Sequence, residues 1–306
     1  MATVIVHKAG LLTTVQDRWR YGYQRYGMPV SGAMDVFSLE MANLLVGNDP
    51  GDACLEATIS GPELEFTGAT WVAITGADMD PQLNGQGIPM NTAIDVRPGD
   101  RLGFRGLRSG CRAYIAFAGG IAVPLVMGSR STYLRAGIGG FQGRALMSGD
   151  ELPLVESKGR PRLKKIPEGL IPEYKHEQTI RIISGPEAHY FEIAGLRSFL
   201  STEYTVTAKS DRMGYRLSGE PIRHKEGMTN IISAGISMGT VQVPGDGQPI
   251  ILIADRQTSG GYVRLANVIT VDLTLLAQMR PGDILRFRET TLEKSQQLYF
   301  ERIAGI

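Results

Sequence analysis

The chain has 306 residues, enough for two domains or one large one, and its 42% hydrophobic and 21% charged composition is ordinary for a soluble globular protein. Its 32 basic and 31 acidic side chains leave a net charge of +1, so no general electrostatic attraction to nucleic acid or an anionic membrane is expected. The longest apolar runs are strand-sized, below the ~20 residues of a membrane helix, and the first ten residues do not resemble a signal peptide. We therefore expect a cytoplasmic protein without a membrane segment.

Short runs rich in β-branched and aromatic residues recur along the chain between glycines and prolines, which is typical of strands. In chain order they are TVIVH, TWVAITG, RAYIAFAGG, TIRIISG, EYTVTA, GTVQVPG, PIILIA and DILRFRE. Helical periodicity is confined to residues 33–48, 186–201 and 271–279. The pattern predicts a mostly-β protein with a few short helices.

Residues 156–175 differ in composition from their surroundings. They are basic, carry three prolines and show no periodic apolar face, which is typical of a linker. The linker would separate subdomains at 1–155 and 176–306. The two halves also echo each other, because SGPELEF and RPGDRLGF in the first half answer SGPEAHYF and RPGDILRF in the second. We interpret the halves as related subdomains with unequal insertions.

Several standard motifs are absent or incomplete. Cys54 and Cys111 are the only cysteines, and neither they nor the four histidines show a metal-ligand spacing, so no metal site is predicted. GISMG around Ser237 matches a hydrolase nucleophile motif, but strand-like runs flank it on both sides. GIGGFQGR at residues 137–144 lacks the lysine and spacing of a phosphate-binding loop. We expect no cofactor bound by a recognisable motif.

A short motif that combines Asp, Arg, Gly and Tyr occurs three times in the chain and is the strongest candidate for a functional site. It occurs as DRWRYGY from Asp17, DRMGY from Asp211 and ADRQTSGGY from Ala254. A carboxylate beside an arginine can orient a small polar substrate, and glycines let the backbone approach it. The alternative is that each Asp-Arg pair is a salt bridge that locks the end of a strand. The candidate residues are Lys209, Asp211, Arg212, Tyr215, Asp246, Gln248, Asp255, Arg256, Thr258 and Tyr262, with Arg130 and Ser131 as a weaker anion site.

Longer strings resemble one family. LLTTVQDRWRYGYQRYGMPVSGAMD, FAGGIAVPLVMGSRSTYL, GGFQGR, KSDRMGYRL and VPGDGQPIILIADRQTSGGY are similar to the KipA family of biotin-dependent carboxyltransferase-domain proteins. The similarity covers nearly the whole chain and is weakest across residues 156–175. It implies tandem cyclophilin-like β-barrel subdomains. It also implies two partner chains, one KipI-like and one of the LamB/YcsF type, in a complex that uses ATP to cleave 5-oxoproline to glutamate.

Under this resemblance Asp211 and Asp255 would act as general base or orienting group, with Lys209 assisting. Arg212 and Arg256 would clamp the carboxylate or oxyanion of the small-molecule substrate. The sequence departs from the family at Arg264, where a lysine is usual, and it contains no biotinyl-lysine segment. Two alternatives stay open: a regulatory protein that binds a KipI-type histidine-kinase inhibitor, and a half-module of a urea carboxylase or allophanate-type carboxyltransferase.

Overall fold

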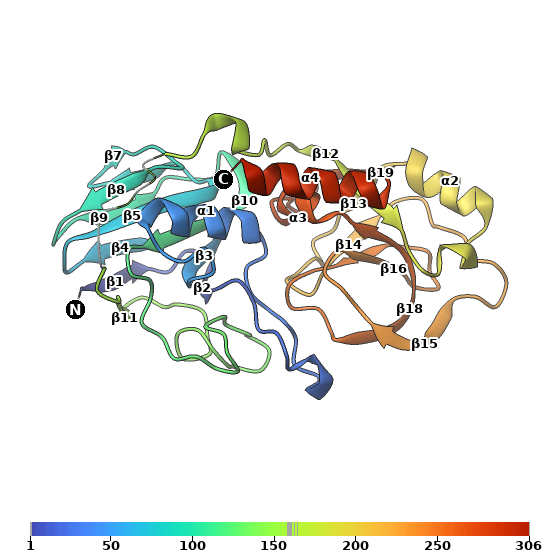
Figure 1. The fold of residues 1–306 in the computed structure, drawn as a ribbon, viewed down its shortest axis with the longest axis horizontal. Coiled ribbons are helices and arrows are strands. Elements are labelled where there is room, and N and C mark those ends of the chain that lie inside the picture. The colour runs from blue at the N-terminus through green and yellow to red at the C-terminus, as the bar shows by residue number, and fades with distance from the viewer. Residues whose placement is uncertain (1, 158–160, 162, 164, 306) are drawn as a thin grey trace. The chain divides into compact units, whose positions relative to one another are not determined.

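The computed structural model describes residues 2–157, 161, 163 and 165–305, and the chain divides into two compact units. The first unit contains Met1–Tyr21 and Ser31–Ile171, and the second contains Gly22–Val30 and Pro172–Ile306 (Figure 1). The change from one unit to the other falls inside the predicted linker, of which residues 158–160, 162 and 164 lie outside the described part. The sequence did not indicate that Gly22–Val30 belongs to the second unit.

The first unit is built from eleven strands and one α-helix among the residues that the structure describes. They are β1 (Thr3–Lys8), β2 (Leu12–Gln16), α1 (Val36–Val46), β3 (Cys54–Thr58), β4 (Glu63–Phe66), β5 (Thr70–Asp78), β6 (Pro81–Leu83), β7 (Gln86–Gly87), β8 (Ala93–Val96), β9 (Arg101–Phe104), β10 (Ser109–Phe117) and β11 (Glu151–Pro153). The strands form two sheets, ordered β11-β1-β4-β9-β6-β7 and β2-β3-β10-β5-β8. A short 3₁₀ turn, η2 (Glu168–Leu170), ends the unit.

The alternation of side chains along β10 explains how the first unit is layered. Ala113, Ile115 and Phe117 point into a core that the two sheets share, with Phe66 of the facing sheet 6.1 Å from Phe117 between ring centroids. Tyr114 and the alternate alanines point the other way, into a second cluster formed with α1. The β10 sheet is therefore covered on both faces, which accounts for its almost unbroken apolar sequence.

Helix α1 confirms the predicted helix over residues 33–48 and has clear start and stop signals. Asp35 is the N-cap, and its carboxylate accepts hydrogen bonds from the Ser38 backbone N–H at 3.1 Å and the Ser38 hydroxyl at 2.6 Å. Gly47 ends the helix in the left-handed conformation, with φ of 79°. Figure 1 shows α1 lying along β5 and β10.

The second unit contains a closed barrel. Its elements are η1 (Gln24–Tyr26), β12 (Glu177–Ser184), η3 (Ala188–Tyr190), α2 (Ile193–Ser201), β13 (Tyr204–Val206), β14 (Gly214–Ser218), β15 (Asn230–Gly235), β16 (Thr240–Val243), β17 (Ile250–Leu252), β18 (Ser259–Val268), η4 (Thr270–Asp272), α3 (Leu273–Ala277), β19 (Ile284–Glu289) and α4 (Leu292–Ala304). The strand order is β12-β19-β13-β14-β17-β16-β18, and β12 also pairs with β18, which closes a ring of seven strands. Strand β15 extends the sheet beyond β18. The two units confirm the prediction of a mostly-β fold.

Aromatic side chains bring α2 into contact with the wall of the barrel. The Phe199 ring of α2 lies 4.3 Å from the Phe287 ring of β19 between centroids, and Tyr204 of β13 completes the group at 5.9 Å from Phe287. All three rings are buried. This cluster anchors α2, of which Gly195 and Phe199 are the buried residues.

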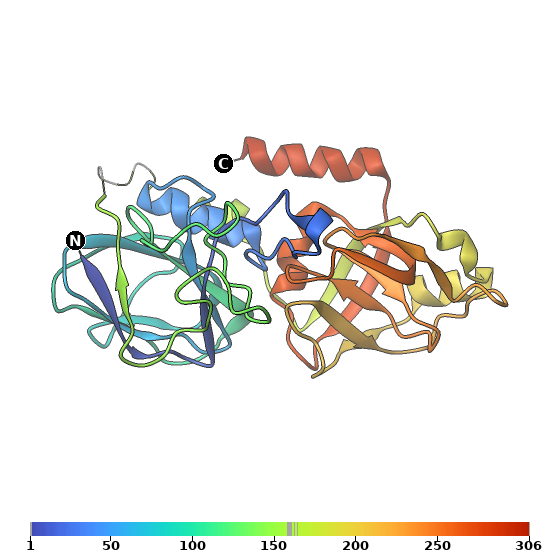
Figure 2. The same cartoon turned by 90° about the horizontal axis from the view of Figure 1, so that it is seen from below.

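The helix α4 was not predicted from the sequence. None of its residues is buried, and Figure 2 shows it running along the outside of the second unit. Its start has a recognisable signal, because the Thr291 hydroxyl accepts a hydrogen bond from the Lys294 backbone N–H. The polar composition of the helix hid this signal. In the described residues no helix is both long and apolar enough to cross a membrane.

One of the two sequence echoes corresponds to a shared structure. In RPGD, the carboxylates of Asp100 and Asp283 accept a backbone N–H from Arg97 and Arg280 at 2.7 and 2.8 Å, and each turn leads into a strand. The SGPE echo diverges, since the first copy leads into β4 and the second into η3. The two RPGD segments therefore form the same hydrogen-bonded turn, and in each case the turn precedes a strand.

Part of the predicted linker packs against the first unit. Ile166 is 3% exposed within the α1 cluster, and its backbone N–H donates to the Asn91 carbonyl at 3.0 Å. Leu163 and Leu170 pack against the same cluster. The sequence had indicated no apolar face here because these residues do not follow a helical or strand period.

Candidate functional site

The tightest pairing among the predicted site residues joins Arg212 and Asp255. Strands β14 and β17 are antiparallel with Gly214 opposite Leu252, so the residues that flank these strands meet. Arg212 Nε donates to Asp255 Oδ2 at 2.9 Å and Nη2 donates to Oδ1 at 3.2 Å. Side-chain exposures are 9% for Arg212 and 7% for Asp255. This forked, buried geometry is what the salt-bridge alternative requires.

Arg256 and Tyr215 are also committed to internal contacts. Arg256 donates from Nε to the Ile236 carbonyl at 3.2 Å and from Nη1 to the Ile253 carbonyl at 3.1 Å. The Tyr215 hydroxyl donates to the Met279 carbonyl at 3.1 Å, and its ring is 2% exposed. Arg256 therefore joins the segments that follow β15 and β17, and Tyr215 joins β14 to the segment that follows α3.

The other predicted residues of the second unit lie closer to the surface. Asp211 is exposed, and its Oδ1 accepts the Met213 backbone N–H at 2.8 Å, which closes a tight turn before β14. Lys209 and Tyr262 are exposed, and Thr258 is half-buried. These side chains are the ones that a substrate or a partner chain can reach.

Asp246 and Gln248 act together as a local brace. The exposed Asp246 accepts the Gln248 backbone N–H at 3.0 Å. The amide of Gln248 then accepts from the Gly219 N–H and donates to the Gly219 carbonyl, both at 3.0 Å. The pair ties the β16–β17 connection to the end of β14.

Arg264, where the family resemblance implies a lysine, forms an ion pair that the sequence did not reveal. Its Nε donates to Glu187 Oε2 at 2.7 Å, and its Nη2 donates to Oε1 at 2.5 Å. These hydrogen bonds hold the pKa of Glu187 below its usual value. Glu187 belongs to the SGPE echo, which was the only sequence signal pointing to it.

The first-unit candidates, Arg130 and Ser131, surround Asp17. The Arg130 backbone N–H donates to Asp17 Oδ2 at 2.5 Å, and the hydroxyls of Ser129 and Ser131 both donate to Oδ1. Ser131 is fully buried, and Arg130 Nε donates to the Val123 carbonyl at 3.1 Å. Asp17 therefore anchors this loop, and the Ser131 hydroxyl is already engaged by a carboxylate.

A second buried acid cluster lies at the start of α1. Tyr114 donates its hydroxyl to Glu56 Oε2 at 2.7 Å and accepts the Asp35 backbone N–H at 2.8 Å. The Met34 backbone N–H also donates to Glu56, at 2.9 Å. Burial raises the pKa of Tyr114 well above its usual value, and the neighbouring carboxylates add to the effect. The cluster fixes the entry to α1.

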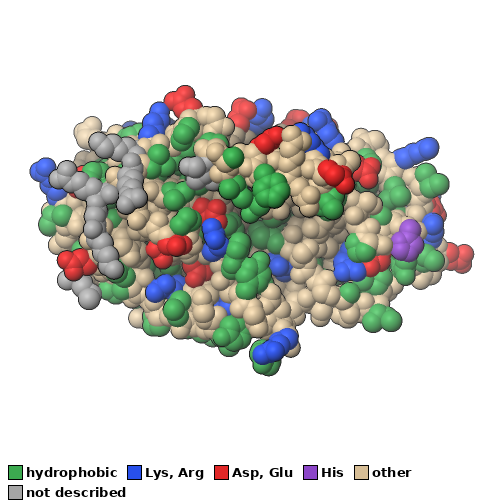
Figure 3. Space-filling model, in the orientation of Figure 1, with side chains coloured by type: hydrophobic (Ala, Val, Ile, Leu, Met, Phe, Trp, Pro, Cys, Tyr) green, Lys and Arg blue, Asp and Glu red, His purple; other side chains and the backbone are tan. Residues whose placement is uncertain are grey.

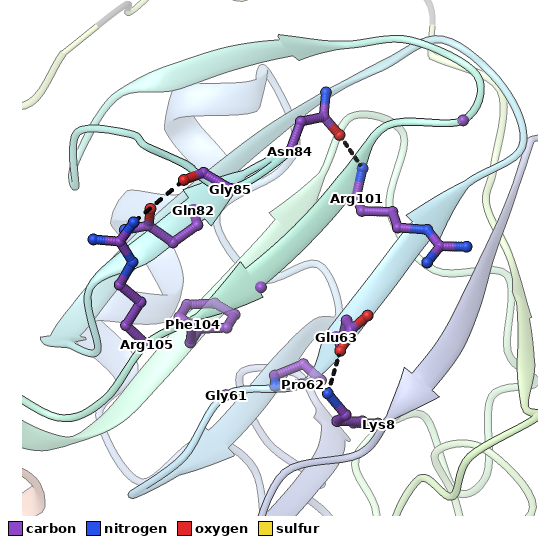
Figure 4. Close-up of a pocket in the computed structure, with 12 residues that line it drawn as sticks. Lys8, Gly61, Pro62, Glu63, Gln82, Asn84, Gly85, Arg101, Phe104 and Arg105 are labelled. Carbon is purple, nitrogen blue, oxygen red and sulfur yellow. Dashed lines mark hydrogen bonds and ion pairs between the residues drawn. The ribbon is translucent and has the colours of Figure 1, made fainter.

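A cavity of about 460 Å³ opens on the first unit, and none of the residues predicted from sequence lines it (Figure 4). It is lined by Lys8, Gly61, Pro62, Glu63, Gln82, Asn84, Gly85, Gly99, Arg101, Gly103, Phe104 and Arg105. Six of these residues belong to β1, β4, β6 and β9, and the others lie in the connections beside these strands. Figure 3 shows that charged side chains of both signs are scattered over the visible face of the molecule. The sequence offered one signal for it, the charged alternation of RPGDRLGFR.

The fold and sequence place the chain in a known family. A sequence model of the carboxyltransferase domain, subdomain A and B, matches residues 26–289. This match covers most of the chain, and the chain belongs to that family.

Particular relatives sharpen the comparison. The chain is 40% identical to the 5-oxoprolinase C subunit of Escherichia coli, over 97% of this chain and 96% of the relative. It is 35% identical to the 5-oxoprolinase C subunit of Haemophilus influenzae, over 93% of this chain and 90% of the relative. The crystal structure of K. lactis urea amidolyase superposes with a TM-score of 0.94 at 31% identity, over 99% of this chain but 20% of that protein. These matches support the predicted resemblance and the predicted fold class.

Proposed function

We propose that this chain is the C subunit of a 5-oxoprolinase. The observation that carries the proposal is the end-to-end similarity with the Escherichia coli protein, at 40% identity over 97% of this chain and 96% of the relative. Coverage of both chains distinguishes this relative from the urea amidolyase, of which this chain spans about a fifth. Similarity over the full length of both chains supports the same place in a complex.

The reaction that we propose for the complex is the ATP-dependent hydrolysis of 5-oxoproline to glutamate. A lactam is a poor electrophile, so ATP would activate the lactam oxygen by phosphorylation before water attacks the ring carbon. The sequence contains no recognisable nucleotide motif, which favours ATP binding by a partner chain. We propose a KipI-like chain and a LamB/YcsF-type chain as the two partners.

Within this chain, we assign different roles to the exposed and the buried members of the second-unit cluster. Lys209 and Asp211 are exposed and border Arg212, so they are our candidates for acid–base groups. Asp255 is buried against Arg212, which supports a role as a positioning residue acting through that arginine. Thr258 and Tyr262 would contact the substrate or the partner chain.

A second candidate function is a half-module of a carboxyltransferase. The superposition on urea amidolyase with a TM-score of 0.94 supports it, since that protein contains this fold within a longer chain. The third possibility, regulation through a KipI-type inhibitor of a histidine kinase, rests on the family resemblance alone.

Reconstitution separates these candidates. The chain is purified with the KipI-like and LamB/YcsF-type proteins from the same genome, and glutamate release from 5-oxo-L-proline is measured with ATP, omitting each protein in turn. We expect release only when all three proteins and ATP are present. Urea-dependent ATP hydrolysis with a biotin carboxylase, in place of glutamate release, would favour the carboxyltransferase. Binding to the KipI-like protein with neither activity would favour the regulator.

A further inference from the structure

Helix α4 is held to the second unit by one face only. Its half-buried residues are Ser295, Leu298 and Arg302, which follow one another at spacings of three and four and therefore share a face. Element η4 of the second unit lies next to the helix. Every other residue of α4 is exposed. Among the described residues, the remaining faces of α4 are therefore open to solvent.

A second face of α4 carries a stripe of exposed apolar side chains. Leu292, Tyr299, Phe300 and Ile303 are 54%, 42%, 65% and 50% exposed. At 3.6 residues per turn, these four positions fall within about 100° of one another around the helix axis. We call them the apolar stripe, and they are distinct from the half-buried face. Adjoining exposed apolar side chains of this kind mark an interaction surface.

The spacing of residues along the stripe is symmetric. Leu292, Gln296, Tyr299 and Ile303 are separated by four, three and four positions, which is the spacing along the seam of paired helices. This spacing is the same from either end, so a second α4 that runs in the opposite direction meets it residue for residue. Leu292 then lies beside Ile303 of the second copy, and Gln296 lies beside Tyr299, whose hydroxyl can bond to the amide.

The charges at the two ends of α4 favour the same orientation. Glu293 lies in the first turn of the helix, and Arg302 lies in the last turn. An antiparallel pair brings the acidic first turn of one helix to the level of the basic last turn of the other, and the helix dipoles attract as well. A parallel pair would bring like charges to the same level at both ends. The stripe itself contains no charged residue, so pairing buries no unpaired charge.

We infer that α4 is the interface of a homodimer, in which two copies of this chain pair through their apolar stripes with the helices antiparallel. The two-fold axis passes between residues 297 and 298, so each copy offers the same surface to the other. A contact of one helix on each side is smaller than the ~1,000 Å² of a standard specific interface, so we expect a reversible dimer with a micromolar to millimolar dissociation constant. The inference concerns this chain alone and does not rest on the proposed reaction of the complex.

Sedimentation equilibrium of the purified full chain tests the dimer. We expect the average mass to rise from that of one chain towards that of two as the concentration increases to about 0.5 mM. Ile303→Glu places a charge in the stripe and should weaken dimerisation by at least about tenfold. The residue is exposed, so the variant should fold, and thermal unfolding checks that it does. A monomeric wild type at every concentration would overturn the inference.

Two matched controls test whether the contact lies on α4. Ile193 in α2 and Ile232 in β15 are also exposed isoleucines, at 69% and 95%. We expect Ile193→Glu and Ile232→Glu to dimerise as the wild type does. Wild-type dimerisation of Ile303→Glu, or an equal loss in either control, would show that α4 is not the specific interface.

Disulfide cross-linking tests the orientation of the two helices. Residues 292 and 303 of one helix are about 16 Å apart along its axis, too far for a bond within one chain. In the antiparallel pair these positions of opposite copies are adjacent. We therefore expect Leu292→Cys with Ile303→Cys to give a covalent dimer on mild oxidation, and Ile303→Cys alone to give none. The native Cys54 and Cys111 are buried and should not react. A covalent dimer from Ile303→Cys alone would show a parallel pair and contradict the inference.

A partner chain is the other occupant that the stripe can accept. If the wild type stays monomeric and Ile303→Glu prevents binding of the KipI-like protein, the stripe belongs to that partner and the homodimer is wrong. Because the sedimentation experiment uses no ATP and no partner chain, its failure is distinct from a failure of the reconstituted complex to release glutamate.

Discussion

Arg212 and Asp255 face each other across the β14–β17 pair with two hydrogen bonds, at 2.9 and 3.2 Å, and both side chains are buried. They lie 43 residues apart in the sequence. Arg212 belongs to the DRMGY copy of the Asp-Arg motif, and Asp255 belongs to the ADRQTSGGY copy. The ion pair therefore joins two copies of the motif.

Asp255→Asn should destabilise the protein. The change removes the charge that neutralises the buried Arg212 guanidinium, and breaking such a pair costs about 3–5 kcal/mol. Urea unfolding measures the loss. Asp211→Asn is the matched control, because that aspartate is exposed and an asparagine can keep its turn, so we expect a loss within about 0.5 kcal/mol. Equal stabilities for wild type and Asp255→Asn would show that the charge of Asp255 does not stabilise the fold.

The Glu187–Arg264 pair should make stability depend on pH in the acidic range. Hydrogen bonds from Arg264 lower the folded-state pKa of Glu187 from its ordinary value of 4.5. The stabilisation is therefore complete above that value and is lost as the pH falls through the lower, folded-state pKa. Glu187→Gln should cost about 2 kcal/mol at about pH 7 and distinctly less at about pH 3. An equal loss of stability from Glu187→Gln at both pH values would contradict this linkage.

The glycines of the loop that holds Asp17 should differ sharply in their tolerance of a side chain. Gly139 has φ of +70°, and a Cβ there would lie 2.0 Å from the Ser131 carbonyl oxygen. Gly137 has φ of +64° but open space around its Cβ. We expect Gly137→Ala to cost about 1 kcal/mol from backbone strain, and Gly139→Ala roughly 2–4 kcal/mol. Thermal unfolding of both variants tests this, and equal losses would mean that the clash is relieved locally.

Cys54 should be unreactive in the native protein. Its side chain is fully buried, and burial raises the pKa of its thiol well above the usual range. Cys111 is buried as well. A thiol reagent at about pH 8 should label neither cysteine in the folded chain and both after unfolding in guanidinium chloride. Rapid labelling of Cys54 in the native protein would contradict its buried position.

Limited proteolysis tests the predicted domain division. Prolines and charges predominate in residues 156–175, so we expect the first cut there. Ile166 and Leu170 pack against the first unit, and cleavage should therefore favour residues 156–162 over residues 165–171. A first cut within residues 241–262 would show that the division is wrong.

Part of the local structure was predictable from the sequence, because the strand segments expected there correspond to β1, β5, β10, β12, β13, β16, β17 and β19, whereas the other strands were not predicted. Helix α1 was expected because Met41 and Leu45 recur on one face and Gly47 supplies a stop signal, and α1 lies where this pattern predicts. Helix α4 was missed although its apolar residues Leu292, Tyr299, Phe300 and Ile303 recur at helical spacing, and in the structure these side chains are exposed. Sequence signals within one helix or strand, such as periodicity and stop residues, were therefore more informative than signals that depend on contact with another element.

The candidate site could not be predicted to the same degree. Its pairings join residues far apart in sequence, as when Ser131 binds Asp17 across 114 positions. A single sequence shows that an aspartate and an arginine are present but not which partner each one finds. The cavity was missed for a related reason, because the residues that line it come from segments that lie far apart in the sequence.

The closure of the barrel in the second unit bears on how the protein is made. Strand β12 begins the barrel and needs β19 beside it in parallel, and β19 lies near the end of the chain. During synthesis the ring cannot close until Glu289 has left the ribosome, and until then β12 carries an open edge. The first unit, by contrast, has all its strands by Pro153. A growing chain thus passes through a long interval with one unit ready to fold and the other waiting for its last strand, which is the interval in which chaperones would be needed most.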